Sequence, residues 1–190
     1  MKFPRLLLAL ATVVSVAWPS MAARAETAPS LPNLVSFGAG WFDVTPNTPR
    51  KQAIEFRLEH RWGASLLPMT SDYFTSWNSW LQIHPFAGLQ TTTHAYLYGF
   101  GGFVFDFLIG DHWVISPNVA VGAYDRGNGK NLGCRVEFRS TMEAGYRFEN
   151  EMRVTAYFGH TSNARMTHLN PGVNSLGLYV HVPTSVIFGL

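Results

Sequence analysis

Two stretches of the chain alternate between apolar and charged side chains, and this alternation limits the folds that the chain can adopt. In residues 54–62 and 135–148, one set of alternate positions holds mainly Arg and Glu, and the other set is mainly apolar. A period of two is typical of β-strands whose two faces differ. We expect the charged rows to fill the interior of an eight-stranded barrel, where opposite charges pair, and the apolar rows to face lipid. A soluble barrel is the alternative, and it would place the apolar rows inside.

The N-terminal residues predict export. Lys2 and Arg5 precede an apolar run of about 13 residues, which is too short to span a bilayer, and residues 23–25 (Ala-Arg-Ala) are typical of a signal-peptide cleavage site. We therefore expect a signal peptide at 1–25 and one barrel domain at 26–190. The single cysteine excludes an intrachain disulfide, and a net charge of +2 without a basic run argues against a nucleic-acid partner.

Eight segments have the length and pattern of membrane-crossing strands, with turn sequences between them. The expected strands are residues 34–43, 52–62, 80–91, 95–108, 113–124, 134–148, 151–161 and 173–182. With both chain ends on the inner side, the loops near 44–51, 92–94, 125–133 and 162–172 are expected to face outward. The 63–79 connection departs from this scheme because it is long and aromatic yet falls on the inner side. The expected fold is an all-β, eight-stranded antiparallel transmembrane β-barrel.

A polar pair lies on the apolar face of the seventh expected strand. The alternation in residues 152–160 continues so that His160 and Ser162 leave the apolar face about 7 Å apart at Cα. Asn174 has the same parity on the adjoining eighth strand. Ser becomes a nucleophile when a base takes its proton, and a His base needs a third group to fix its tautomer. The three residues are therefore candidates for a catalytic site that faces lipid near the outer rim. The alternative is a structural His followed by a Ser-Asn pair that opens a turn, and the residues alone favour it.

The site motif is His160-Thr161-Ser162-Asn163-Ala164, followed by Asn170-Pro171-Gly172 before the last strand. It resembles the lipid A 3-O-deacylase (PagL-type) family of outer-membrane enzymes. Supporting segments extend over most of the chain: 37–40 (Phe-Gly-Ala-Gly), 55–59 (Glu-Phe-Arg-Leu-Glu), 85–88 (Pro-Phe-Ala-Gly), 116–117 (Ser-Pro), 132–133 (Leu-Gly) and 137–140 (Glu-Phe-Arg-Ser). The resemblance implies an eight-stranded barrel in the cell outer membrane that removes the 3-linked acyl chain from lipid A of lipopolysaccharide.

The same resemblance assigns roles to individual residues. It makes Ser162 the nucleophile and His160 the general base, with Asn163, Ala164 and the amides that follow them contributing to an oxyanion hole. The third position departs from the family, where a Glu stands twelve residues after the Ser and this chain has Asn174. An amide can accept a hydrogen bond from imidazole but cannot stabilise imidazolium with a charge. A slower enzyme, an inactive scaffold, and recruitment of Asp43 as a substitute carboxylate all stay open.

The remaining functional expectations are few. The histidines at positions 84, 94, 112, 168 and 181 (His84, His94, His112, His168 and His181) form no cluster at ligand spacing, so we expect no metal and no cofactor. Arg126, Lys130 and Arg165 lie in expected outer loops and can meet lipid A phosphates, although a merely solvated loop explains them equally well. The expected partners are lipopolysaccharide and outer-membrane lipid, and a homodimer stays an open alternative. The competing functions are a non-catalytic outer-membrane barrel, structural or adhesive, and a soluble lipocalin-like carrier.

Overall fold

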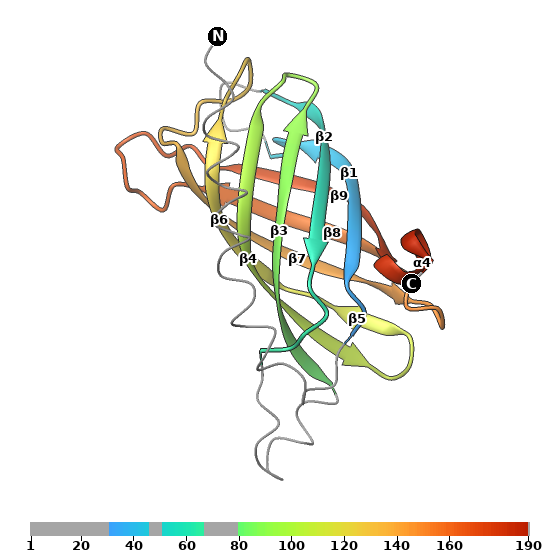
Figure 1. The fold of residues 1–190 in the computed structure, drawn as a ribbon. Helices are drawn as coiled ribbons and strands as arrows, with labels where there is room; N and C mark the ends of the chain where they lie inside the picture. The colour runs from blue at the N-terminus through green and yellow to red at the C-terminus, as the bar shows by residue number, and fades with distance from the viewer. Residues whose placement is uncertain (1–30, 46–50, 67–79, 190) are drawn as a thin grey trace.

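The computed structural model describes residues 31–45, 51–66 and 80–189. The expected signal peptide at 1–25 and most of the 63–79 connection lie outside these residues. The strands are β1 (Leu34–Phe42), β2 (Ala53–Arg61), β3 (Leu81–Thr92), β4 (Leu97–Ile109), β5 (Trp113–Ile115), β6 (Asn118–Asp125), β7 (Val136–Arg147), β8 (Arg153–Ser162) and β9 (Val173–Pro183), and a short helix, α4 (Thr184–Phe188), follows them. Figure 1 shows α4 and the loop between β8 and β9 at opposite ends of β9.

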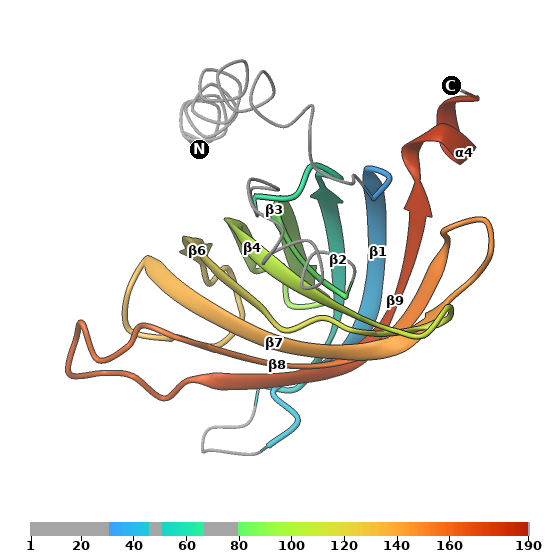
Figure 2. The same cartoon turned by 90° about the horizontal axis from the view of Figure 1, so that it is seen from below.

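The strands close into a barrel through antiparallel pairing. Consecutive strands pair along the chain, except that β5 and β6 both lie between β4 and β7, and β1 also pairs with β9, which closes the ring. Figure 2 shows the sheet curving from β7, β8 and β9 round to β2, β3 and β4. Closure gives every strand two partners and leaves no unpaired edge, as a membrane-spanning sheet requires. The predicted eight-stranded antiparallel transmembrane β-barrel is confirmed.

The fifth expected strand, residues 113–124, is divided into β5 and β6. The division falls at Ser116-Pro117, where proline has no N–H for the strand ladder. The register does not change across it: β4 pairs Phe107 with Ile115 before the break and Val104 with Asn118 after it. The two short strands therefore occupy one of the eight positions in the barrel.

The outer face of the barrel is apolar, as the alternation predicts. Among its exposed apolar side chains are Phe37, Trp41, Phe56, Leu58, Phe103, Val121, Phe138, Met142, Phe158, Leu176 and Leu178. An apolar exterior around a polar interior is the arrangement of transmembrane barrels and the reverse of a soluble one. In the described part of the chain, no helix is long and apolar enough to cross a membrane.

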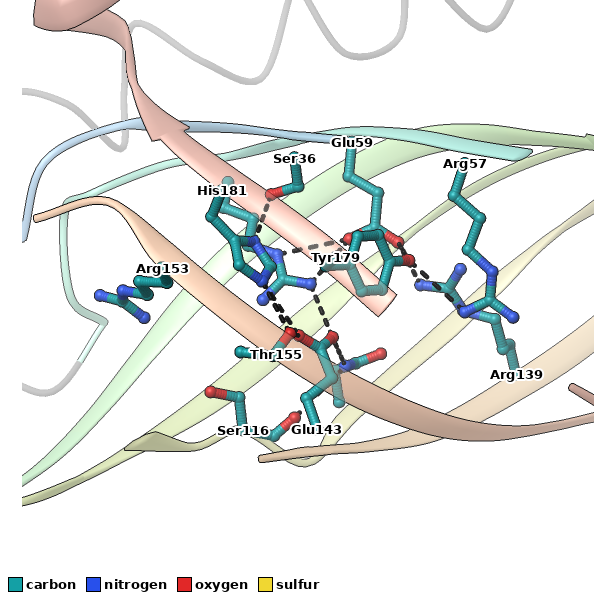
Figure 3. Close-up of polar contacts among 12 residues, drawn as sticks. Ser36, Arg57, Glu59, Ser116, Arg139, Glu143, Arg153, Thr155, Tyr179 and His181 are labelled. Atoms are coloured by element: carbon teal, nitrogen blue, oxygen red, sulfur yellow. Dashed lines mark hydrogen bonds and ion pairs between the residues drawn. The ribbon is translucent and has the colours of Figure 1, made fainter. Parts of the chain in front are cut away.

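The interior is filled by paired charges, and this prediction is also confirmed. Glu59 lies at the centre, where it accepts hydrogen bonds from Arg61 and Arg139, both at 2.9 Å, and from the Tyr179 hydroxyl at 2.5 Å. Arg61 reaches on to Glu143 at 2.7 Å. Figure 3 shows Glu59, Arg139, Glu143 and Tyr179 pointing toward one another in this network. Removing one partner of a buried ion pair destabilises a protein by about 3–5 kcal/mol. This network therefore stabilises the packing of β2, β7 and β9 against one another.

A second group of buried side chains is apolar and rich in aromatic residues. It includes Phe42, Phe86, Tyr96, Tyr98, Phe100, Tyr124, Leu132 and Val173. Phe42 and Val173 are at the ends of β1 and β9 that lie near the site motif, so this cluster packs beneath the outer loops. The loops that carry the candidate site therefore rest on a packed interior.

Leu58→Arg tests the assignment of the outer face. Leu58 lies in the middle of β2 and is flanked on the same face by Phe37 of β1 and Leu89 of β3. An Arg at a lipid-facing position near the bilayer midplane costs about 2–4 kcal/mol. We expect the urea unfolding free energy of the barrel in lipid vesicles to fall by this amount, measured by the gel mobility of unboiled samples.

Val186→Arg provides the matched control. Val186 is an exposed apolar residue of α4, outside the barrel strands. We expect this variant to unfold like the wild type. If Leu58→Arg is as neutral as Val186→Arg, the face that carries Leu58 does not lie in the hydrocarbon.

Candidate active site

His160 and Asn174 are hydrogen-bonded neighbours on adjacent strands. They are paired in the β8–β9 register, and His160 Nδ1 lies 2.7 Å from Asn174 Oδ1. An amide oxygen can only accept, so Nδ1 carries the proton and donates it. The neutral ring therefore leaves Nε2 without a proton. This is the tautomer that a general base for Ser requires.

Ser162 is the last residue of β8 and shares the outward face with His160. Across the β7–β8 ladder, Ser162 pairs with Phe138, and His160 pairs with Ser140. Among the described residues, Ser162 Oγ forms no hydrogen bond, so its partnership with His160 stays a prediction. The hydroxyl therefore lies on the outer face of the barrel and not in its interior.

Glycine at position 172 makes room for the imidazole. Gly172 has a φ of +60°, a conformation that other residues rarely adopt. A Cβ added there would lie 2.9 Å from His160 Cε1 and 3.4 Å from Nε2. The backbone before β9 therefore packs against the edge of the ring that carries the free nitrogen.

Asn163 and Ala164, the predicted oxyanion residues, follow Ser162 directly. Asn163 is fully buried, and its backbone N–H donates to Asn170 Oδ1 at 3.1 Å. Its side-chain amide donates to the carbonyls of Leu132 and Leu169 at 2.9 and 2.8 Å. These bonds hold the 163–172 loop to the loop before β7, and the oxyanion roles of Asn163 and Ala164 stay predictions.

The backbone turns sharply after Asn163. Ala164 and Arg165 have φ values of +51° and +64°, which are uncommon for residues with a Cβ. Such conformations persist where surrounding contacts fix the chain, and they gather at functional sites. Here the contacts of Asn163 supply that constraint.

Asp43 is not a partner of His160, and that prediction is wrong. Its φ of +61° ends the alternation of β1 and turns the side chain inward. The carboxylate is fully buried, where it binds Lys130 Nζ at 2.7 Å and accepts the Lys51 backbone N–H at 3.0 Å. The same ion pair withdraws Lys130 from any lipid phosphate, so that expectation is also wrong. Arg126 and Arg165 are exposed, and their phosphate contacts stay predictions.

Thr45 also contacts the site, and no sequence pattern had indicated it. Asn174 Nδ2 donates to Thr45 Oγ1 at 2.6 Å, and the Val44 backbone N–H donates to the Asn174 carbonyl at 3.0 Å. The two residues are 129 positions apart and meet only because β1 and β9 close the barrel. In the described residues, no group of three or more His, Cys, Asp or Glu is placed to hold a metal ion.

Comparisons with known proteins agree with this arrangement. The lipid A 3-O-deacylase (PagL) family model matches residues 36–183. A crystal structure of the outer membrane enzyme PagL aligns with a TM-score of 0.59 and 25% identity, covering 79% of this chain and 99% of that one. A de novo designed transmembrane β-barrel, at 8% identity and a TM-score of 0.50, covers 80% of this chain and 95% of its own and supports the fold alone. No curated protein matches the chain. Because the family match spans most of the sequence, this chain belongs to the lipid A 3-O-deacylase (PagL) family.

Proposed function

We propose that this protein is an outer-membrane esterase that removes the 3-linked acyl chain from lipid A of lipopolysaccharide. The observation that carries the proposal is the His160–Asn174 hydrogen bond on the outward face, two residues from Ser162. It sets the ring tautomer that a serine hydrolase needs, at a place that lipid can reach. Membership of the deacylase family supports the choice of lipid A as substrate.

The proposed reaction has two half-reactions. Ser162 Oγ attacks the ester carbonyl carbon while His160 Nε2 takes the hydroxyl proton. His160 then gives that proton to the departing sugar oxygen, and the acyl group stays on Ser162. In the second half, His160 takes a proton from water, the resulting hydroxide releases the fatty acid, and the proton returns to Ser162.

The apolar surroundings of the site suit an acyl-chain substrate. Phe158 of β8 pairs with Leu176 of β9 and with Met142 of β7, and all three are exposed on the outward face. This apolar strip runs from His160 toward the middle of the barrel wall. An acyl chain that lies along it would bring its ester bond to the outer end of β8, the level of Ser162.

One observation favours a second function. Asn174 stands where the family has a charged partner, and an amide cannot stabilise imidazolium through charge. A non-catalytic outer-membrane barrel that retains the scaffold is therefore the alternative. Three further parts of the proposal hold for a catalytic and for a non-catalytic barrel alike. They are lipopolysaccharide binding, self-association and export directed by the 1–25 segment.

Mass spectrometry of lipid A separates the two functions. We expect lipid A from a Gram-negative host expressing the protein to lose one 3-hydroxyacyl chain relative to the same host with an empty vector. The folded protein must be found in the outer membrane fraction for the comparison to count. An unchanged spectrum under several growth conditions, with folded barrel present, would favour the non-catalytic scaffold.

A further inference from the structure

The side chain of Asn174 is held at both ends. Its Oδ1 accepts from His160 Nδ1 at 2.7 Å, and its Nδ2 donates to Thr45 Oγ1 at 2.6 Å. Thr45 itself is placed by the backbone, because the neighbouring Val44 N–H donates to the Asn174 carbonyl at 3.0 Å. The residue that replaces the family's Glu is thus bonded to the segment that follows β1.

The two ends of an amide are not equivalent, and this matters for the imidazole. With Oδ1 against the ring, Nδ1 donates and Nε2 is free to accept a proton. With the amide reversed, Nδ2 would donate to Nδ1, the ring proton would sit on Nε2, and the ring could not act as a base toward Ser162. A carboxylate has two equivalent oxygens and needs no such control.

We propose that Thr45 is a positioning residue that holds the Asn174 amide with its oxygen toward His160. A hydroxyl can donate as well as accept, so Thr45 alone does not choose the end of the amide. The ring makes that choice whenever it is protonated, with or without substrate, because imidazolium can only donate. Thr45 accepts from Nδ2 in the chosen orientation and keeps the amide there, and it also draws charge toward Oδ1 through the linked hydrogen bonds.

The inference rests on the proposed function only in the role it gives His160 as a base. It predicts that the Thr45 hydroxyl affects the tautomer and activity of His160 because residue 174 is an amide. Thr45 should matter little if residue 174 is a carboxylate, since either oxygen then faces the ring as an acceptor. This dependence distinguishes positioning of the amide from general support of the loop.

A kinetic cycle tests that dependence. Thr45→Val keeps the shape of the side chain and removes the hydroxyl, and it would be made in the wild type and in Asn174→Glu. In the wild type we expect kcat to fall by at least about tenfold at unchanged KM. The upper limit of the loss is the roughly 10⁴-fold fall in kcat that a wrong His tautomer causes in a serine protease. Thr45→Ser should restore most of the activity. In the Asn174→Glu background, the same Thr45→Val change should have little effect.

Thr93→Val is the matched control for the loss of an exposed hydroxyl. Thr93 is exposed in the loop between β3 and β4, and its side chain makes no hydrogen bond in the described structure. It should leave kcat unchanged. Equal losses from Thr45→Val in both backgrounds would overturn the proposal, because they would mean that Thr45 supports the loop regardless of residue 174.

A spectroscopic test does not depend on turnover. In histidine-¹⁵N-labelled barrel folded in detergent, protonated and bare ring nitrogens have well-separated shifts, and His160→Gln identifies the signals of His160. We expect a protonated Nδ1 in the wild type and Thr45→Ser, protonation shifting toward Nε2 in Thr45→Val, and recovery of protonated Nδ1 when Asn174→Glu is added. If lipid A is never cleaved, the proposed function fails but this result still decides the role of Thr45. A His160 tautomer that is unchanged in Thr45→Val would overturn the inference even in an active enzyme.

Discussion

Replacing Ser162 by Ala is expected to abolish release of 3-hydroxy fatty acid from purified lipopolysaccharide while the barrel stays folded. Loss of the nucleophile in a serine protease lowers kcat by roughly 10⁶-fold, which would place this variant at background. Folding should persist because Ser162 Oγ forms no hydrogen bond among the described residues and the residue sits at the end of β8. The assay is fatty-acid release in detergent, with unboiled gel mobility as the measure of folding.

Ser140→Ala is the matched control for that variant. Ser140 is paired with His160 in the β7–β8 register and is exposed on the same outward face, so it is the serine of β7 that best tests the assignment of the nucleophile. We expect Ser140→Ala to keep wild-type activity. An inactive Ser140→Ala together with an active Ser162→Ala would transfer the nucleophile to β7, and activity in both would exclude a serine mechanism at this face.

The barrel could be predicted from sequence because its two faces differ so strongly in polarity. Residues 54–62 show this best: their charged row is buried in ion pairs, and apolar residues such as Phe56 and Leu58 are exposed. A one-residue shift of register would move every charge into lipid, so the pattern specifies the register as well as the fold. At Pro117 the strand lacks one backbone N–H donor, and the strand divides there. The pattern of side chains on either side of Pro117 does not indicate this division.

The site could be predicted only in part, because alternation extends no further than the strand that carries it. His160 and Asn174 lie within strands, and parity placed them on one face, where the structure brings them together. Asp43 lies one residue past β1, and its positive φ reverses the direction that parity assigned. Thr45 is further along the same loop, and its contact with Asn174 depends on how β1 and β9 close. Positions set by loop geometry therefore needed the three-dimensional structure.

Asn174→Glu is expected to raise turnover, by about 10- to 1000-fold, because it supplies the charge that the site lacks. In a serine protease, Asp to Asn at the equivalent position lowers kcat by about 10⁴, and part of that loss comes from the wrong tautomer. Here the tautomer is already set by the amide oxygen, 2.7 Å from Nδ1, so the gain should come mainly from stabilising imidazolium and should fall short of the full factor. Asn174 is partly exposed, which leaves room for the extra methylene of Glu.

The control for this gain is Asn174→Ala, which removes the acceptor altogether and should lower kcat below that of the wild type. Both variants would be assayed on purified lipopolysaccharide after equal amounts of folded barrel are confirmed. A silent wild type that becomes active with Asn174→Glu would mean that the chain keeps the deacylase scaffold and lacks one charge. If Asn174→Glu is slower than the wild type while Asn174→Ala is slower still, the amide is the better partner in this site. The hydrogen bond that Asn174 Nδ2 donates to Thr45 would then be the feature that makes it so, because Glu has no N–H to donate to the hydroxyl at position 45.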